Sequence, residues 1–232
     1  FSDGSPLTSE DVQYTVNSFK DPSKNFKLAS DYKFMDVQIQ DAQHFTIKLK
    51  TPFQSLPLRL TCMNILPKNY LEKIGDEGFS QSPIGSGPYK VQQWDKDNQI
   101  ILVRNDRYYG KKPKADKIIF KIIPEAASRL AALESHEVDI ISNVQTSEIP
   151  RLKELSGVKV VGGPTTRVIF LGMNLQEDSP LKNQKVRQAL NYAIDKQALI
   201  QGVLDGNATQ IATIATPQYQ FYDAAVAPYE YN

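Results

Sequence analysis

The part of the sequence that most restricts the fold is a pair of helical patterns over residues 183–204. Four apolar residues recur there at intervals of three and four, which is the spacing of one helix face: Val186, Ala189, Leu190 and Ala193. A shorter pattern follows over residues 196–204 and stops before Gly206, a residue type that favours helix ends. The first pattern predicts an amphipathic helix over residues 183–194, and such a helix needs an apolar partner for its apolar face.

The first third of the sequence predicts a helix, a hairpin and several short pieces. Thr8 and Asp11 form a capping-box pattern ahead of apolar residues at helical spacing, so residues 9–19 are expected to be helical. Residues 34–39 and 45–49 are rich in alternating apolar side chains on either side of a polar turn, as in a β-hairpin. Three prolines then divide the following apolar stretch into turns and short helical pieces: Pro52, Pro57 and Pro67.

The middle of the sequence predicts a second hairpin and a crossover. Residues 89–94 and 99–103 flank a polar turn and are rich in β-forming side chains. A β-branched run, a helical pattern and a second apolar run then follow in order, at residues 117–123, 126–133 and 138–141. Strand, helix and strand predict a crossover that places two parallel strands in one sheet. Ligands bind at the carboxyl edge of such sheets, so the loop at 142–145 is a candidate binding loop.

Composition narrows the classes of function. The 232 residues include 27 basic and 26 acidic side chains, so no overall field favours nucleic acid or an anionic membrane. No apolar run approaches the roughly 20 residues that a membrane-spanning helix needs. Cys62 is the only cysteine, which excludes an internal disulfide and a thiolate metal cluster. Its apolar surroundings predict a buried, inert thiol.

Three patterns could indicate chemistry other than binding. Gly85-Ser86-Gly87 has the small residues of a phosphate loop, but neither a third glycine nor a Lys-Ser/Thr pair follows. His44 and His136 are the only histidines and lack the spacing of a metal-binding pair, so no protein-built metal site is expected. A hydrolase that uses a serine or Cys62 with a histidine stays open as an alternative, because such groups meet in space and not in sequence.

Four stretches carry a resemblance to one protein family: residues 1–12, 83–90, 129–140 and 186–200. In this order they resemble family 5 of the bacterial extracellular solute-binding proteins. The resemblance implies an α/β fold of the type II periplasmic-binding-protein kind, with two lobes that close about a hinge. It also implies that a peptide, nickel chelate, opine or oligosaccharide is captured outside the membrane and delivered to the permease of an ABC importer. No cofactor and no catalytic residue are implied.

The resemblance predicts how the chain is divided. We expect most of lobe I at 1–161, comprising a peripheral α+β subdomain at 1–82 and an α/β core part at 83–161, then a hinge region at 162–167 and the beginning of lobe II at 168–232. The predicted hinge residues are Gly162, Gly163 and Pro164. Glycine allows backbone angles that other residues avoid, and proline fixes its own φ. A first residue other than Met suggests an internal fragment, so an export signal and any lipid anchor would lie outside it.

Short peptides are the ligands that we expect first, because hydrogen bonds to a peptide main chain give affinity that does not depend on side chains. The candidate ligand-binding residues lie in loops at strand ends and around the crossover: Gly85, Ser86, Asn143, Gln145, Arg167 and Asn174. The resemblance adds that Pro88 stands where nickel-chelate binders can carry Arg, and that His136 stands where Gly is common. Receptors for nickel chelates, opines and oligosaccharides stay open as alternatives.

Two aromatic stretches remain. Residues 104–117 combine basic side chains with Tyr108 and Tyr109, a mixture that can stack on nucleic acid bases. The stretch is similar to an Arg-Asn-x-x-Tyr-(Tyr/Trp)-Gly pattern of the family, so we interpret it as structural and expect no nucleic acid partner. The aromatic tail suggests that the fragment self-associates, through Tyr219, Phe221, Tyr222, Tyr229 and Tyr231.

Overall fold

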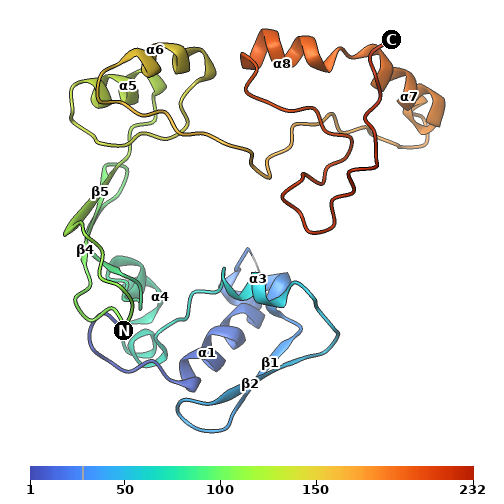
Figure 1. The fold of residues 1–232 in the computed structure, drawn as a ribbon. Helices are drawn as coiled ribbons and strands as arrows, with labels where there is room; N and C mark the ends of the chain where they lie inside the picture. Colours follow the sequence, from blue (N-terminus) through green and yellow to red (C-terminus); the bar gives the residue numbers. More distant parts are fainter. Residues whose placement is uncertain (28) are drawn as a thin grey trace. The chain divides into compact units, whose positions relative to one another are not determined.

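The chain folds into two compact units, Phe1–Ile123 and Pro124–Asn232 (Figure 1). The computed structural model describes residues 1–27 and 29–232, and within these ranges every side chain but that of Asp31. The boundary between the two compact units lies after residue 123. The predicted boundary between lobes lies at 162–167, and this division into lobes stays a prediction.

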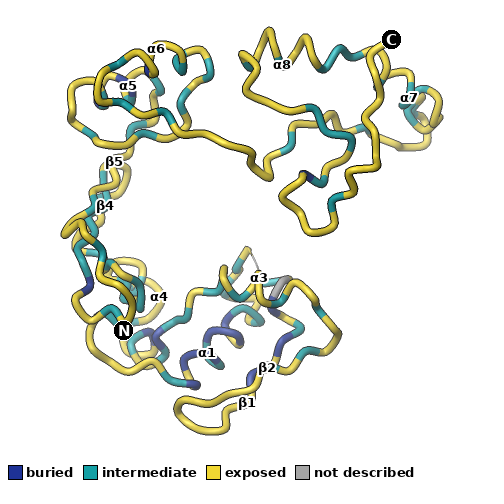
Figure 2. The backbone as a smooth tube through the Cα atoms, in the orientation of Figure 1, coloured by how far each residue is buried: buried dark blue, intermediate teal, exposed yellow. Residues whose placement is uncertain are grey.

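The first unit is built on α1, Ser9–Lys20, and a two-stranded hairpin. Strand β1, Met35–Ile39, pairs antiparallel with β2, Phe45–Leu49, so that Met35 faces Leu49 and Ile39 faces Phe45. Side chains of α1, of the hairpin and of Tyr32, which precedes the hairpin, form a small core: Val12, Val16, Tyr32, Met35 and Val37. Figure 2 shows this core as the main buried region of the tube. The helix and hairpin predicted from the sequence are both confirmed.

Asp11 joins two helices of the first unit. Its Oδ2 accepts hydrogen bonds from the Thr8 backbone N–H at 2.7 Å and the Thr8 hydroxyl at 3.0 Å, as the capping pattern predicted. Its Oδ1 accepts from the backbone N–H of Lys68 at 2.9 Å, the first residue of α4, Lys68–Gln81. Asp11 is 5% exposed, so this buried carboxylate holds the starts of α1 and α4 together.

Helix α4 was missed by the sequence analysis. It runs for 14 residues, but Gly75 within it has a φ of 72° and interrupts the helix with a kink. The glycines at 75 and 78 obscure the apolar period from which long helices are recognised. The shorter helical pieces are α2, Ala29–Tyr32, and α3, Leu56–Leu60, the second of which lies among the prolines as predicted.

A second sheet completes the first unit. Its three strands are β3 (Tyr89–Asp95), β4 (Gln99–Arg104) and β5 (Lys117–Lys121). They lie side by side in that order, and both pairings are antiparallel. The second predicted hairpin is therefore confirmed, with an irregularity between Val91 and Gln93.

The predicted parallel crossover is wrong for the described residues. The first of its two strands, β5, pairs antiparallel with β4, and residues 138–141 form no strand. A strand needs a neighbour that satisfies its backbone hydrogen bonds, and none of the described residues pairs with this apolar run. The side chain of Ile140 is accordingly 87% exposed. The helix of the crossover is present as α5, Ala126–Glu134.

The second unit carries four α-helices in its described residues. They are α5, α6 (Ile149–Glu154), α7 (Gln184–Ala193) and α8 (Lys196–Leu204). The last two confirm the helices predicted at 183–194 and 196–204. Few of its side chains are buried, namely Leu130, Ala132, Leu152 and Thr216. The apolar face of α7 is largely uncovered, since Leu190 is 40% exposed. Unit 2 therefore lacks a core comparable with that of unit 1 (Figure 2).

Helix α5 ends in a turn that places a histidine where glycine is favoured. His136 has a φ of 59°, in the left-handed region. The His136 N–H donates to the carbonyl of Leu133 at 3.1 Å, and the Glu137 N–H donates to that of Ala132 at 2.8 Å. These two bonds define a Schellman motif. The turn therefore has the left-handed conformation that favours glycine, although the residue is histidine.

Replacing His136 by glycine is expected to stabilise the end of α5 by about 1 kcal/mol. A side chain in the left-handed region costs about 1–2 kcal/mol, and the greater backbone entropy of glycine offsets part of the gain. Slower amide exchange at Glu137 would report the change. Ser135 has an ordinary φ of −81°, so Ser135→Gly should bring no such gain. Equal effects of the two changes would contradict the explanation.

Candidate functional site

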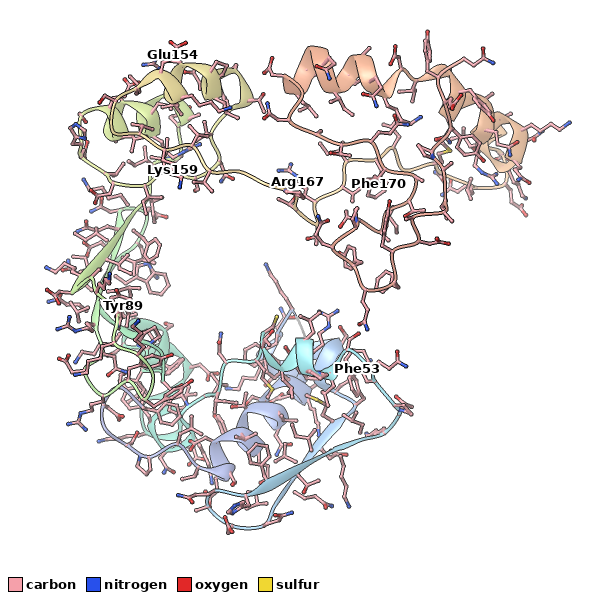
Figure 3. The ribbon with its side chains drawn as sticks, in the orientation of Figure 1. Phe53, Tyr89, Glu154, Lys159, Arg167 and Phe170 are labelled. Carbon is pink, nitrogen blue, oxygen red and sulfur yellow. The ribbon has the colours of Figure 1, made fainter. Side chains whose placement is uncertain are left out.

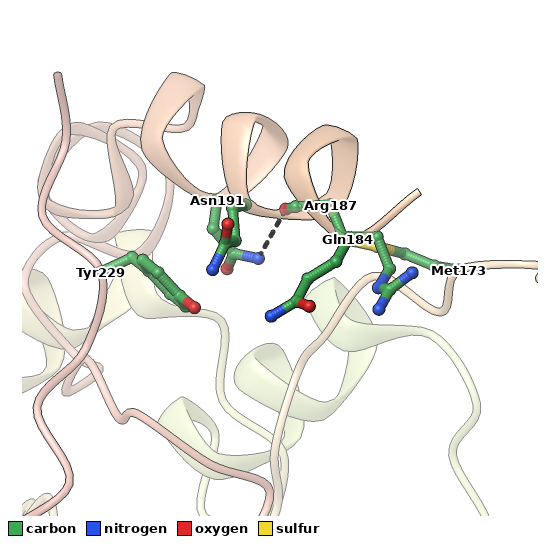
Figure 4. Close-up of a pocket in the computed structure, with 6 residues that line it drawn as sticks. Met173, Gln184, Arg187, Asn191 and Tyr229 are labelled. Carbon is green, nitrogen blue, oxygen red and sulfur yellow. Dashed lines mark hydrogen bonds between the residues drawn. The ribbon is translucent and has the colours of Figure 1, made fainter. Parts of the chain in front are cut away.

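An open pocket of about 280 Å³ lies against α7 in the second unit (Figure 4). Helix α7 supplies most of its wall, and one residue each comes from the extended segment before the helix and from the carboxyl-terminal tail. The lining residues are Met173, Gln184, Arg187, Gln188, Asn191 and Tyr229.

Hydrogen bonds within the second unit fix the wall of this pocket. The Arg187 guanidinium donates to the carbonyls of Leu181 and Lys182, both at 2.8 Å, and so secures the turn before the helix. The Asn191 Nδ2 donates to the Arg187 carbonyl at 3.0 Å, which is the dashed line in Figure 4. The tail is held by Tyr229, whose ring meets that of Tyr192 edge-on at 5.1 Å between centroids.

Polar groups of the pocket remain available to a ligand. The side chains of Gln184 and Gln188 and the hydroxyl of Tyr229 form no hydrogen bond within the part of the chain that the structure describes. A primary amide both donates and accepts, and a phenol does the same. Such groups suit the N–H and C=O groups of a peptide main chain. No carboxylate lines the pocket, so nothing in it opposes an anionic end of a ligand.

These pocket residues were not predicted from the sequence. The apolar face of the helix at 183–194 predicted the helix, whereas the pocket is lined by the opposite, polar face. Gln184, Gln188 and Asn191 recur at intervals of four and three residues, so the signal was present in the sequence. Tyr229 could not have been found this way, because only the fold of the tail brings it to α7.

The predicted loop at Gly85 and Ser86 lies in the first unit. The Ser2 N–H donates to the carbonyl of Gly85 at 2.7 Å. The carbonyl of Gly87 accepts from the side chain of Asn105 at 2.9 Å. The loop is thus held at both sides, and the space around Gly85 is open. The predicted tight loop before β3 is present, and its role in ligand binding stays a prediction.

The other four predicted site residues lie in the second unit and are all exposed. Asn143 has a φ of 56°, and Gln145 precedes a turn at Thr146–Glu148. Arg167 lies on an extended segment with Phe170 (Figure 3). Asn174 accepts a hydrogen bond from the Gln176 N–H at 3.2 Å and adjoins Met173 of the pocket. None of the four lines the pocket on α7.

The predicted hinge residues lie on the same exposed stretch. A Cβ at Gly162 or Gly163 would meet no atom within 4 Å, and neither glycine has a positive φ. Pro164 is also exposed. The hinge stays a prediction, as does the gathering of the six site residues around one ligand.

The groups that could support catalysis do not converge. The His44 Nδ1 lies 2.9 Å from Asp41 at the surface. Hydrogen bonds from the Gln43 N–H and from His44 hold the pKa of the Asp41 carboxyl below its ordinary value. No serine or cysteine is a hydrogen-bond partner of either histidine in the described ranges. Within the same ranges, no group of three His, Cys, Asp or Glu residues could hold a metal ion.

The prediction that Cys62 is buried is wrong, because this residue is exposed. Helix α3 ends at Leu60, and the chain then turns. The neighbours Leu60 and Met63 pack against the core of the first unit, so Cys62 between them faces solvent. The nearest side-chain partner of the thiol is the Thr61 hydroxyl at 3.9 Å.

Comparison with known proteins places the chain in a family. The sequence profile of the "Bacterial extracellular solute-binding proteins, family 5 Middle" matches residues 1–232. The chain belongs to family 5 of the bacterial extracellular solute-binding proteins. The resemblance seen in the four sequence stretches is thereby confirmed. No helix in the described residues of this family 5 chain is long and apolar enough to cross a membrane.

Relatives of known structure or name support the same assignment. The dipeptide-binding protein of Escherichia coli K12 is 31% identical over 89% of this chain and 38% of its own length. The structure of the Bacillus subtilis oligopeptide-binding protein AppA in complex with a nonapeptide has a TM-score of 0.82 and 27% identity. The structure of Campylobacter jejuni NikZ in complex with Ni(L-His) has a TM-score of 0.85 and 26% identity.

These likenesses confirm the predicted fold class, an α/β architecture of the type II periplasmic-binding-protein kind. Both structures are matched over the whole of this chain and over 47% of their own chains. The family 5 chain therefore spans less than half the length of these relatives.

Proposed function

We propose that the chain is part of the substrate-binding component of an ABC importer and that its ligands are short peptides. The observation that carries the proposal is the family 5 match over residues 1–232, together with relatives named for dipeptide and oligopeptide binding. The pocket on α7 agrees with it, because free amides and a phenol suit a peptide main chain. Ligand capture is followed by delivery to the permease, and the protein catalyses no reaction on the ligand.

Ligand binding by two lobes needs no chemistry beyond hydrogen bonds and the exclusion of water. A ligand that contacts both lobes favours the closed form by its difference in affinity for the open and closed forms. In this proposal Arg167 contributes from the hinge region and Asn174 from lobe II, whereas lobe I contributes Gly85, Ser86, Asn143 and Gln145. The protein works in the periplasm or at the outer cell surface, where a lipid anchor could retain the complete protein.

A nickel-chelate receptor is the second candidate. It is favoured by the likeness to NikZ in complex with Ni(L-His), at a TM-score of 0.85. In the present chain, Pro88 occupies the place where nickel-chelate binders can carry Arg. A proline has no donor with which to hold an anionic chelate, so the peptide is the preferred ligand.

Native mass spectrometry of the complete protein, purified without denaturation, tests the proposal. We expect a ladder of short-peptide masses on the protein. Gln188→Ala should lower affinity for the retained peptides about five- to tenfold, because one hydrogen bond contributes about 1 kcal/mol. Gln201→Ala is the matched control on α8, outside the pocket, and should leave affinity unchanged. A single mass of a metal chelate, an opine or a sugar would overturn the peptide assignment.

A further inference from the structure

One loop of the first unit concentrates positive charge that the chain as a whole does not have. Residues 104–117 contain six basic and two acidic side chains, and so carry a net charge of +4. The whole chain carries +1, so the remaining residues together carry −3. We call residues 104–117 the lysine loop. An overall charge near zero therefore conceals a local patch with a strong preference for anions.

The base of the lysine loop is held firmly between β4 and β5. Asn105 is 3% exposed, its N–H donates to the carbonyl of Pro88 at 2.9 Å, and its carbonyl accepts from the Tyr108 N–H at 3.0 Å. The Tyr89 hydroxyl, at the start of β3, donates to the carbonyl of Ala115 at 2.9 Å. These hydrogen bonds fix the base of the loop to the sheet.

Arg104 engages both acidic residues of the loop at this base. Its guanidinium lies 3.3 Å from Asp106 and also pairs with Asp116. Lys112 lies 3.8 Å from Asp106, at the far limit of an ion pair. Lys111 and Lys114 form no ion pair with any described residue. The negative charge is therefore held at the base, and the positive charge lies toward the tip.

The tip of the lysine loop also presents two tyrosines. The rings of Tyr108 and Tyr109 lie 4.8 Å apart between centroids, and Tyr109 is 87% exposed. A tyrosine ring is apolar over its face and polar at its hydroxyl, so it is well suited to a boundary between water and an apolar phase. Flanking lysines keep their charges in the polar layer of such a boundary.

We propose that the lysine loop docks the protein on anionic phospholipid headgroups of the membrane that holds its importer. Lysine is depleted at protein–protein interfaces, where arginine is enriched, and the cations at this tip are lysines. Polybasic segments beside tyrosine are instead typical of membrane surfaces. Docking would keep a solute-binding protein close to the membrane between rounds of delivery. The inference does not depend on which ligand the protein binds.

Vesicle co-sedimentation of the complete protein, prepared without lipid modification, tests this inference. The vesicles contain phosphatidylcholine either alone or with phosphatidylglycerol as about a third of the lipid. The wild type is expected to bind the anionic vesicles only. The triple variant Lys111→Gln, Lys112→Gln, Lys114→Gln should bind at least about tenfold more weakly, because each cation near such a surface contributes roughly fivefold at low salt.

A matched control carries the same loss of charge elsewhere in the first unit: Lys27→Gln, Lys48→Gln and Lys50→Gln. It should bind anionic vesicles like the wild type. Equal losses in the two triple variants, or equal binding of the wild type to neutral vesicles, would overturn the proposal. The proposal would also be overturned if the wild type bound neither kind of vesicle and instead crosslinked through the lysine loop to an acidic surface of the permease. Peptide affinity should be the same in all variants, so this test can fail without affecting the proposed ligand.

Discussion

Replacing Asp11 by alanine is expected to destabilise the first unit by about 3–4 kcal/mol. The change leaves three donors without their acceptor: the Thr8 N–H, the Thr8 hydroxyl and the Lys68 N–H. A buried donor that loses its partner costs about 1–3 kcal/mol, and these three are partly buried, so each is expected to contribute near the lower end of that range. The carboxylate also lies at the start of two helices, where negative charge is favoured. A loss of this size is a large fraction of the stability of an ordinary domain.

Urea unfolding followed by circular dichroism would measure this effect. Asp11→Asn keeps one oxygen acceptor and should cost less than the alanine variant. Glu10→Ala is the matched control, because Glu10 is a neighbouring, exposed acid that pairs with the Lys68 side chain at 2.8 Å. An exposed ion pair contributes about 0–1 kcal/mol. If Asp11→Ala were no more costly than Glu10→Ala, the proposed role of Asp11 as a bridge between α1 and α4 would be wrong.

Much of the first unit could be predicted because its signals are local. The capping pair Thr8 and Asp11 marks the start of α1, and alternation of apolar residues marks β1 and β2. The bond from Asp11 to Lys68 could not be predicted, since 57 residues separate the two in sequence. The kink at Gly75 hid α4 for a related reason, because a glycine within a helical pattern is usually evidence against a helix.

The prediction of the crossover was wrong for its second strand, because a strand needs a neighbouring strand that can be distant in sequence. Residues 138–141 have the composition of a strand, but composition does not supply the neighbouring strand that makes the hydrogen bonds. The described residues contain no such neighbour for this run. The helix of the same prediction, α5, succeeded because a helix makes its hydrogen bonds within itself.

The candidate site was predictable only in part. The helix that carries the pocket follows from its apolar period, and its polar face could have been read from the same pattern. The contribution of Tyr229 depends on how the tail returns to α7, which no local signal encodes. Gly85, Ser86, Asn143, Gln145, Arg167 and Asn174 were chosen for loop positions alone, and a common role for them stays a prediction.

The chain of residues 1–232 is expected to self-associate by itself through the apolar segment at 168–171. Three consecutive side chains are strongly exposed there: Ile169 at 77%, Phe170 at 67% and Leu171 at 74%. Alternate side chains of an extended backbone point to opposite faces, so in a strand Ile169 and Leu171 would share one face and Phe170 would lie on the other. Apolar residues on both faces are typical of strands that are covered on both sides. No backbone hydrogen bond joins residues 168–171 to another described residue.

This segment is a stronger reason for association than the aromatic tail considered in the sequence analysis. Part of the tail is already engaged, because Tyr229 contacts Tyr192 and Tyr219 stacks on Phe221 at 5.2 Å. The segment at 168–171 has free edges in addition to its apolar faces, and free strand edges pair with other chains. Burying one large aliphatic side chain contributes about 1.5–3 kcal/mol. Two copies that cover Ile169 and Leu171 of each other bury four such side chains, about 6–12 kcal/mol, against an association cost of about 4 kcal/mol or more.

Sedimentation equilibrium of the chain 1–232 would measure this association. Ile169→Ser with Leu171→Ser should weaken it at least about tenfold, which corresponds to 1.4 kcal/mol. Leu7→Ser with Leu58→Ser is the matched control, because these leucines are 42% and 69% exposed in the first unit and lie in no extended segment of this kind. Equal weakening by the two pairs would indicate unspecific apolar contact. In the complete protein the same serine pair should instead reduce stability, because a segment that is apolar on both faces has to be buried there.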